Sequence, residues 1–185
     1  MKNTRERNII YTQQYHTACG ELILGAANGR LCLCDWTAAK HRNTVRERLQ
    51  KALYADCTEQ KTEITEEAAK QLEQYFKGKR TRFDIPLLLI GTDFQQRVWE
   101  KLREIPYGET RSYAELAQEA GVPKGIRAVA NATGANALSI FIPCHRIIGS
   151  NHSLTGYAGG LRAKEFLIKL ESLTLLDRQR GQNAF

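Results

Sequence analysis

The 185-residue sequence has no long apolar run, and its hydrophobic segments fall short of the roughly 20 residues that cross a membrane. Its first residues, MKNTRERNII, lack the apolar stretch and cleavage site of a secretory signal. Internal repeats and low-complexity tracts are also missing, and 42% hydrophobic with 25% charged residues is typical of a folded globular protein. We therefore expect a cytoplasmic protein with no membrane partner.

Cysteines are few and odd in number. Five cannot all pair, and intracellular thiols stay reduced, so a disulfide framework is not expected. Four residues near the start could in principle bind zinc: His16, Cys19, Cys32 and Cys34. The paired spacings of zinc sites are absent, and Cys32 and Cys34 alternate with leucines, which favours burial as small apolar side chains. We predict no metal site and no organic cofactor.

Acidic residues are absent from one long segment. Residues 122–164 contain five basic side chains and no Asp or Glu, in a chain of net charge +7. The basic residues are Lys124, Arg127, Arg146, Arg162 and Lys164. This distribution predicts a local positive field suited to phosphates, although net charge alone does not establish nucleic-acid binding.

The N-terminal half predicts a small sheet with helices. Residues 9–36 alternate between apolar and polar side chains, and Asn28-Gly29 is a hairpin signal, so we expect an antiparallel sheet. Helices are predicted over residues 38–54 and 66–77, the second ending at Gly78. Residues 79–91 then run extended toward a second part of the chain. We predict an α/β fold with domains at residues 1–90 and 91–185.

The C-terminal half predicts short helices with capping signals. Thr92 with Gln95, and Ser112 with Glu115, mark two helix starts. The helix that begins at Ser112 should end at Gly121, and another helix should cover residues 124–133. Two short helices joined by a glycine-containing turn form a helix-turn-helix candidate.

The helix predicted over residues 124–133 combines one long cation with very small neighbours. Ile126 and Val129 are expected to face the core, which leaves Arg127 exposed among alanines and glycines. Such a surface could approach a DNA backbone closely, with Arg127 entering the base stack. The alternative is a solvated arginine on a small packing helix, and for this helix taken alone that alternative is the stronger.

A short apolar run at residues 139–142 predicts a buried strand that leads into Pro143-Cys144-His145-Arg146. A strand would separate neighbouring side chains, so Cys144 and His145 can act together only if Pro143 turns the chain. A water molecule would then link sulfur and imidazole. The thiolate is the nucleophilic form of cysteine, so a base and a positive neighbour such as Arg146 would help. The alternative is a chance Cys-His pair.

Longer motifs add a family resemblance. RAVANATGAN, IPCHRIIG and GYAGGLRAKEFLIKLE, with FQQRVWEKLREIPYGETRSYAELA upstream, resemble the O6-alkylguanine-DNA alkyltransferase family over nearly all of residues 92–171. The resemblance implies a ribonuclease H-like N-terminal domain, which matches only loosely, and a winged helix-turn-helix C-terminal domain. It implies DNA repair by a monomer that moves an alkyl group from O6 of guanine, and also from O4 of thymine, in double-stranded DNA to Cys144. The transfer would be irreversible and occur once per protein molecule.

The resemblance also implies roles for individual residues. The catalytic set is Cys144, His145, Glu171, Asn136 and Tyr113. In this set His145 would deprotonate Cys144 through water, and Glu171 would orient the imidazole. The DNA-binding set is Arg127, Tyr113, Ser112 and Lys124, with the second helix of the pair in the minor groove. The substrate-pocket set is Tyr157, Ala158, Ser139 and Gly159, where small side chains leave room for the base.

Two other functions fit parts of the pattern. A cysteine hydrolase would also use Cys and His, but it usually needs a histidine distant in sequence and an oxyanion hole, and it would turn over. A DNA-binding module alone would explain the helix pair and the basic segment, with Cys144 as a packing residue. Within the resemblance, Ser139 and Ala158 occupy positions that vary, so the range of alkyl groups is not predicted.

Overall fold

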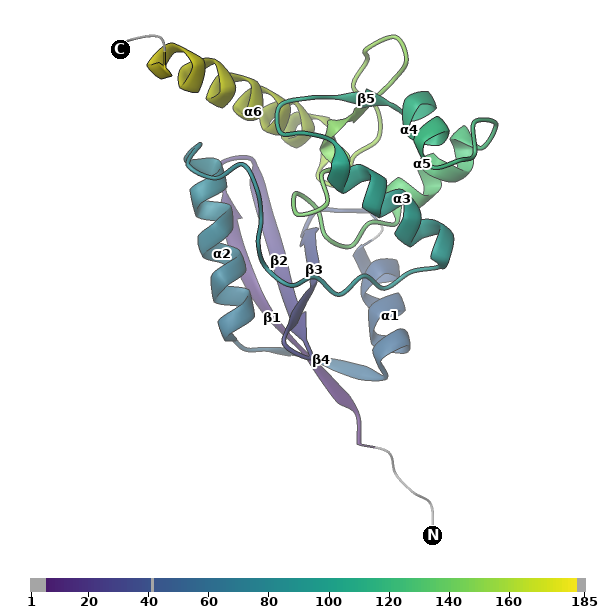
Figure 1. The fold of residues 1–185 in the computed structure, drawn as a ribbon. Coiled ribbons are helices and arrows are strands. Elements are labelled where there is room, and N and C mark those ends of the chain that lie inside the picture. Colours follow the sequence, from purple (N-terminus) through teal and green to yellow (C-terminus); the bar gives the residue numbers. More distant parts are fainter. Residues whose placement is uncertain (1–5, 41, 183–185) are drawn as a thin grey trace.

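The computed structural model describes residues 6–40 and 42–182, and residues 1–5, 41 and 183–185 lie outside the described part. A sheet with helices forms the N-terminal part, and the C-terminal part is mostly helical (Figure 1). The strands are β1 Asn8–Thr17, β2 Gly20–Ala27, β3 Arg30–Trp36 and β4 Ala55–Glu59. They lie in the order β3-β2-β1-β4, and helices α1 (Arg42–Leu53) and α2 (Glu63–Phe76) flank them.

The antiparallel pairing predicted for residues 9–36 is confirmed, and a fourth strand that was not predicted makes the whole sheet mixed. β1 pairs with β2 and β2 pairs with β3 in antiparallel register, and the second hairpin turns at Asn28-Gly29 as predicted. β4 instead pairs with β1 in parallel, because α1 carries the chain back across the sheet before β4 begins. The sequence of β4, ADCTE, has only five residues and no large apolar side chain, so its pattern is too short to mark it as a strand.

The first helix is shorter than predicted. Residues 38–40 are not helical, residue 41 lies outside the described part, and α1 ends before Tyr54, which adopts a φ of +48°. The second helix begins three residues earlier than predicted, at Glu63 against residue 66. Thr62 caps it with a capping box, and Ala68, Leu72 and Tyr75 face the core as expected.

The C-terminal part consists of helices and two very short strands. Its elements are α3 Asp93–Glu104, β5 Arg111–Ser112, α4 Tyr113–Glu119, α5 Ile126–Gly134, β6 Ile147–Ile148 and α6 Gly160–Gln182. α3 and α4 begin with the predicted capping boxes at Thr92 and Ser112. α4 and α5 form the predicted helix pair, with Gly121 at φ +74° in the turn. No helix among the described residues is long and apolar enough to cross a membrane.

Two local predictions in this part are wrong. Ile126 is 43% exposed, because it lies at the outer edge of α5 while Val129 faces the core. Residues 139–142 do not form a strand, since Ile140 adopts a φ of +73°, which an extended strand cannot contain. Residues 139 and 142 instead pair with each other through an isolated bridge, so the chain folds back before it reaches Pro143.

The largest hydrophobic core runs through both parts of the chain. Trp36 and Tyr75 from the N-terminal part belong to one buried cluster with Trp99, Ile142 and Leu167 from the C-terminal part. A second, smaller cluster joins β1, β3, α1 and β4. Because burial of apolar surface is shared between the parts, each one helps to hold the other in place.

The cysteines of β3 are packed as apolar residues. Cys32 and Cys34 have no exposed surface. They belong to different clusters although they lie two positions apart, because the register between β2 and β3 shifts at Gly25 and Ala26 and leaves Cys32 without a paired residue. Among residues 6–40 and 42–182, no group of three or more His, Cys, Asp or Glu side chains is placed to hold a metal ion.

Candidate active site

The Pro143-Cys144-His145-Arg146 motif forms a tight turn. A 3-10 turn covers Cys144–Arg146, and the backbone N–H of Arg146 donates to the carbonyl of Pro143 at 3.0 Å. The turn is buried, with Cys144 7% exposed and His145 fully buried. A strand would send the side chains of Cys144 and His145 to opposite faces. The turn replaces that strand geometry, and a turn at this point is the condition that the sequence set for the two residues to act together.

Asn136 holds the cysteine from the end of α5. Its Nδ2 atom donates to the carbonyl of Ile142 at 3.1 Å and to the Sγ atom of Cys144 at 3.3 Å. Its Oδ1 atom accepts from the backbone N–H of Leu138 at 2.9 Å. These three hydrogen bonds fix the sulfur relative to the end of α5, and they bring Asn136, a member of the predicted catalytic set, into contact with Cys144.

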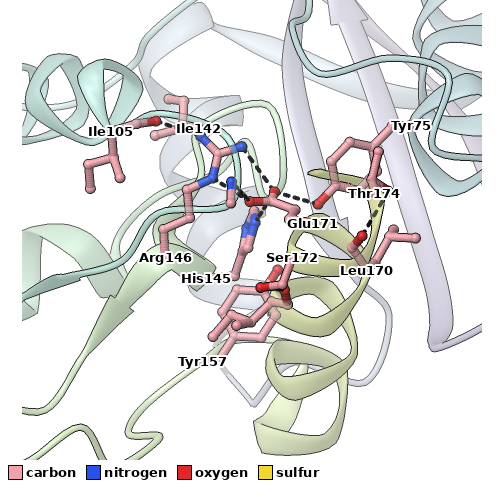
Figure 2. Close-up of polar contacts among 12 residues, drawn as sticks. Tyr75, Ile105, Ile142, His145, Arg146, Tyr157, Leu170, Glu171, Ser172 and Thr174 are labelled. Carbon is pink, nitrogen blue, oxygen red and sulfur yellow. Dashed lines mark hydrogen bonds and ion pairs between the residues drawn. The ribbon is translucent and has the colours of Figure 1, made fainter. Parts of the chain in front are cut away.

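Glu171 on α6 lies at the centre of a buried hydrogen-bond network (Figure 2). Its Oε1 atom lies 2.8 Å from Nε2 of His145 and accepts from the hydroxyl of Tyr75 at 2.7 Å. Its Oε2 atom accepts from the backbone N–H of Gly108 at 2.8 Å. The guanidinium of Arg146 donates to both oxygens, each at 2.9 Å. The carboxylate is 1% exposed, so its charge is paired as a buried charge must be.

The charges in this network follow from the contacts. Burial alone would raise the pKa of Glu171, but the hydrogen bonds and charges of His145 and Arg146 outweigh it and hold that pKa well below its usual range. Burial lowers the pKa of His145 despite the opposing carboxylate. Glu171 is therefore an anion balanced by Arg146, and His145 is neutral. The network assigns the imidazole proton to Nε2, and the buried Nδ1 has no hydrogen-bond partner among the described residues.

Cys144 rests as a thiol. Burial raises its pKa, while the hydrogen bond from Asn136 and the charge of Lys164 lower it. The prediction that Arg146 supplies the positive neighbour is wrong, because its guanidinium is engaged by Glu171 and by the carbonyl of Ile105 at 2.6 Å.

Lys164 is the cation that sequence reasoning missed at this site. It is fully buried on α6, burial lowers its pKa to about 8, and its ammonium donates to the carbonyl of Thr155. A signal for this position does exist in the sequence. Lys164, Leu167 and Glu171 are spaced as one inward face of a helix, so the lysine shares the face that carries the predicted carboxylate.

The predicted pocket residues of the loop before α6 lie around Trp36 and His145. The ring of Tyr157 meets the ring of His145 edge-on at 6.4 Å between centroids, and its hydroxyl accepts from Nε1 of Trp36 at 3.2 Å. Gly159 packs against the indole of Trp36, and Ala158 is exposed. Sequence reasoning did not anticipate Trp36, since no local pattern joins β3 to a loop more than a hundred residues away.

Ser139 and Tyr113, also members of the predicted site, differ in how deeply they are buried. Ser139 is fully buried, and its hydroxyl has no hydrogen-bond partner among the described residues. Tyr113, the first residue of α4, is partly buried; burial raises its pKa and the nearby Cys144 raises it further. Ser112, immediately before it, uses its hydroxyl to accept from the backbone N–H of Glu115, so its side chain already serves as the helix cap.

The predicted positive field is narrower than the sequence suggested. Arg146 and Lys164 are buried, whereas Lys124, Arg127 and Arg162 are exposed. Arg127 lies near the start of α5, and it forms no ion pair within the described part of the chain. Of these five cations, the three that are free to meet phosphates therefore lie on α5, on the turn before it and at the start of α6.

Known proteins resemble this chain over almost its whole length. The constitutive methylated-DNA–protein-cysteine methyltransferase of Bacillus subtilis is 42% identical over 174 residues, which is 91% of this chain and 99% of that protein. Residues 10–89 match the ribonuclease-like domain of 6-O-methylguanine DNA methyltransferase, and residues 93–173 match its DNA binding domain. The chain belongs to this family. The family predicted from the PCHR motif is thereby confirmed.

Further members support the same assignment. The methylated-DNA–protein-cysteine methyltransferase of Methanosarcina barkeri is 51% identical over 136 residues, covering 74% of this chain and 85% of that protein. The crystal structure of Mycobacterium tuberculosis OGT in complex with DNA aligns with a TM-score of 0.75 at 38% identity, covering 90% of this chain and 94% of that one. The predicted α/β fold, with a ribonuclease-like N-terminal domain and a helical DNA-binding C-terminal domain, is confirmed. So is the predicted enzyme class, a DNA repair methyltransferase that transfers a methyl group from O6-methylguanine to a cysteine.

Proposed function

We propose that Cys144 is the cysteine that accepts the alkyl group from O6-alkylguanine in double-stranded DNA, once per protein molecule. The observation that supports this best is a buried thiol, held by Asn136, next to a neutral histidine whose Nε2 is fixed by Glu171. A nucleophile, its base and a group that orients the base are the parts that covalent catalysis by cysteine requires.

The proposed reaction is a displacement at the alkyl carbon. His145 takes the thiol proton through a water molecule, the sulfur forms a bond to the carbon, and the bond from that carbon to O6 breaks. Guanine leaves with the electron pair, and Tyr113 donates a hydrogen bond toward the ring as negative charge develops. The product is a thioether, which has no good leaving group, so each molecule reacts once. The same displacement would act on O4 of alkylated thymine.

The target atom lies inside the base stack, so the base must swing out of the duplex at a cost of about a few kcal/mol. We place α5 in the minor groove, with Arg127 in the gap that the base leaves and Lys124 and Ser112 near the backbone. Exposure of Arg127 and Lys124, and the small exposed side chain of Ala128 beside them, support this arrangement.

The extruded base would enter a pocket beside the thiol. We assign its walls to Tyr157, Ala158, Gly159 and Ser139. The edge-on contact between Tyr157 and His145 supports the assignment, because with this contact the loop lies next to His145, the proposed general base.

We also propose a domain boundary between residues 90 and 91, giving domains 1–90 and 91–185. The two family matches, which end at residue 89 and begin at residue 93, support it. A cytoplasmic monomer would suffice for the reaction, since one chain supplies the thiol, its base and the exposed arginine, and reduced thiols persist in that compartment.

The test is incubation with duplex DNA that carries O6-methylguanine, followed by intact-protein mass measurement and peptide mapping. We expect each protein molecule to gain the mass of one methylene, located at Cys144. Cys144→Ser should bind the DNA and gain nothing, whereas Cys57→Ser, at a half-buried cysteine of β4, should react like the wild type. An unmodified protein with a reduced thiol, or more than one transfer per molecule, would contradict the proposal.

A further inference from the structure

Trp36 connects the N-terminal sheet with the loop at the active site. It is the last residue of β3, it is 2% exposed, and its Nε1 donates to the hydroxyl of Tyr157 at 3.2 Å. The two rings meet edge to face, with centroids 6.0 Å apart and planes at 68°. Tyr157 in turn meets His145, and Figure 2 shows these two rings close together. The rings of Trp36, Tyr157 and His145 therefore form a continuous row from the sheet to the proposed general base.

Two glycines show how closely the chain fits around this indole. A Cβ atom at Gly159 would lie 2.6 Å from two ring atoms of Trp36, which is closer than carbon atoms can approach. A Cβ atom at Gly20 would lie 3.0 Å from another atom of the ring. The absence of a side chain at Gly159 therefore has a cause in the indole itself, in addition to the room for guanine that the sequence suggested.

The same loop is anchored a second time, at its other end. The buried ammonium of Lys164 donates to the carbonyl of Thr155 and lies 3.4 Å from the carbonyl of Gly156. Between this anchor and the indole, Ala158 is exposed. An exposed loop keeps its shape through such anchors. Tyr157 therefore lies between two anchors, Lys164 on α6 and Trp36 on β3.

We propose that Trp36 is a positioning residue that sets the width of the alkyl pocket by holding Tyr157 and Gly159. Through it the N-terminal domain selects which alkyl groups reach Cys144. The inference rests on the proposed function, because it takes Tyr157 as a wall of the pocket. With the indole in place the ring of Tyr157 stays against His145, the residue next to Cys144, which favours a methyl group and disfavours a bulky one. Without the indole Tyr157 can move outward, so the transfer rate of bulky alkyl groups should rise relative to that of methyl.

The test compares transfer rates to Cys144 from duplexes bearing O6-methylguanine and O6-benzylguanine, measured by intact-protein mass. Trp36→Phe keeps an aromatic ring but loses the N–H donor, and the ratio of benzyl to methyl rates should rise roughly threefold to tenfold, the worth of one hydrogen bond. Trp36→Ala should raise the ratio further. Val45→Ala, buried in the other core cluster, is the control for lost stability and should leave the ratio unchanged.

A double-mutant cycle separates positioning from general damage. Gly159→Ala alone drives a methyl group against the indole and should change the rate ratio. In the Trp36→Ala background that collision is gone, so the same substitution should have much less effect. Additive effects, or one ratio shared by the wild type and both Trp36 variants, would overturn the inference while the wild type still reacts. A wild type that reacts with neither duplex would overturn the proposed function, and this inference with it.

Discussion

The two sides of the candidate active site differ in what holds them. On the inner side, the carboxylate of Glu171 takes part in five hydrogen bonds with four other residues, all within this chain. On the outer side, α5 presents Arg127 and small side chains to solvent. The chain therefore completes its proposed reactive group by itself, whereas in the proposed arrangement DNA covers the outer surface.

Glu171→Gln should have the largest effect, because it acts on the inner side. The substitution leaves the guanidinium of Arg146 buried without its counter-charge, so the free energy of unfolding should fall by about 3 to 5 kcal/mol. Methyl transfer should slow as well, since His145 loses the anion that fixes its ring. Urea unfolding and single-turnover kinetics measure both effects. Glu165→Gln, at an exposed glutamate of the same helix, should change neither the free energy of unfolding nor the transfer rate. Equal behaviour of the two variants would mean that the buried network does not hold the inner side of the site.

Lys164 gives the inner side a pH signature. Its pKa is about 8 in the folded protein against an ordinary 10.5, so between these values the unfolded chain holds a proton that the folded protein has released. The free energy of unfolding must therefore rise with pH across this window, by up to about 3 kcal/mol relative to Lys164→Met. Urea unfolding from pH 8 to 10.5 measures the difference, and Lys169→Met, exposed on α6, is the control. Parallel curves for the wild type and Lys164→Met would show that the ammonium is not held away from water.

Arg127→Ala should affect DNA repair and leave stability alone. The side chain is exposed, so the melting temperature should not change, whereas transfer from duplex DNA should fall roughly tenfold to hundredfold because the gap in the stack is no longer filled. Transfer from an unpaired single strand should fall less, since no duplex has to be opened. Arg30→Ala, at the exposed start of β3, is the matched control. Equal losses on both substrates would mean that Arg127 contributes only attraction to phosphates.

Local chemistry explains what the sequence predicted correctly. The capping boxes at Thr92 and Ser112 involve residues three positions apart, so their partners can be recognised without a fold. The hairpin at Asn28-Gly29 is equally local. The contact between His145 and Glu171 spans 26 residues, and the family resemblance is what predicts it.

The features that the sequence did not predict depend on contacts between parts of the chain that are far apart in sequence. β4 pairs Ala55 with Asn8, and nothing in ADCTE announces that partner. Ile140 adopts its positive φ inside a packed turn, where burial outweighs the preference of an apolar run for extended backbone. The hydrogen bond from Trp36 to Tyr157 joins residues that are 121 positions apart, so no local pattern of apolar and polar residues could predict it.

The crowding around Glu171 has a consequence for where protons can go. A carboxylate offers about four lone-pair positions, and hydrogen bonds already occupy its two oxygens from several directions. Glu171 therefore has no free position for a further proton, so one taken from the thiol would stop at the imidazole ring. In the proposed reaction the resulting imidazolium would rest against a permanent anion, and the protein would store the displaced proton internally at the moment the sulfur attacks.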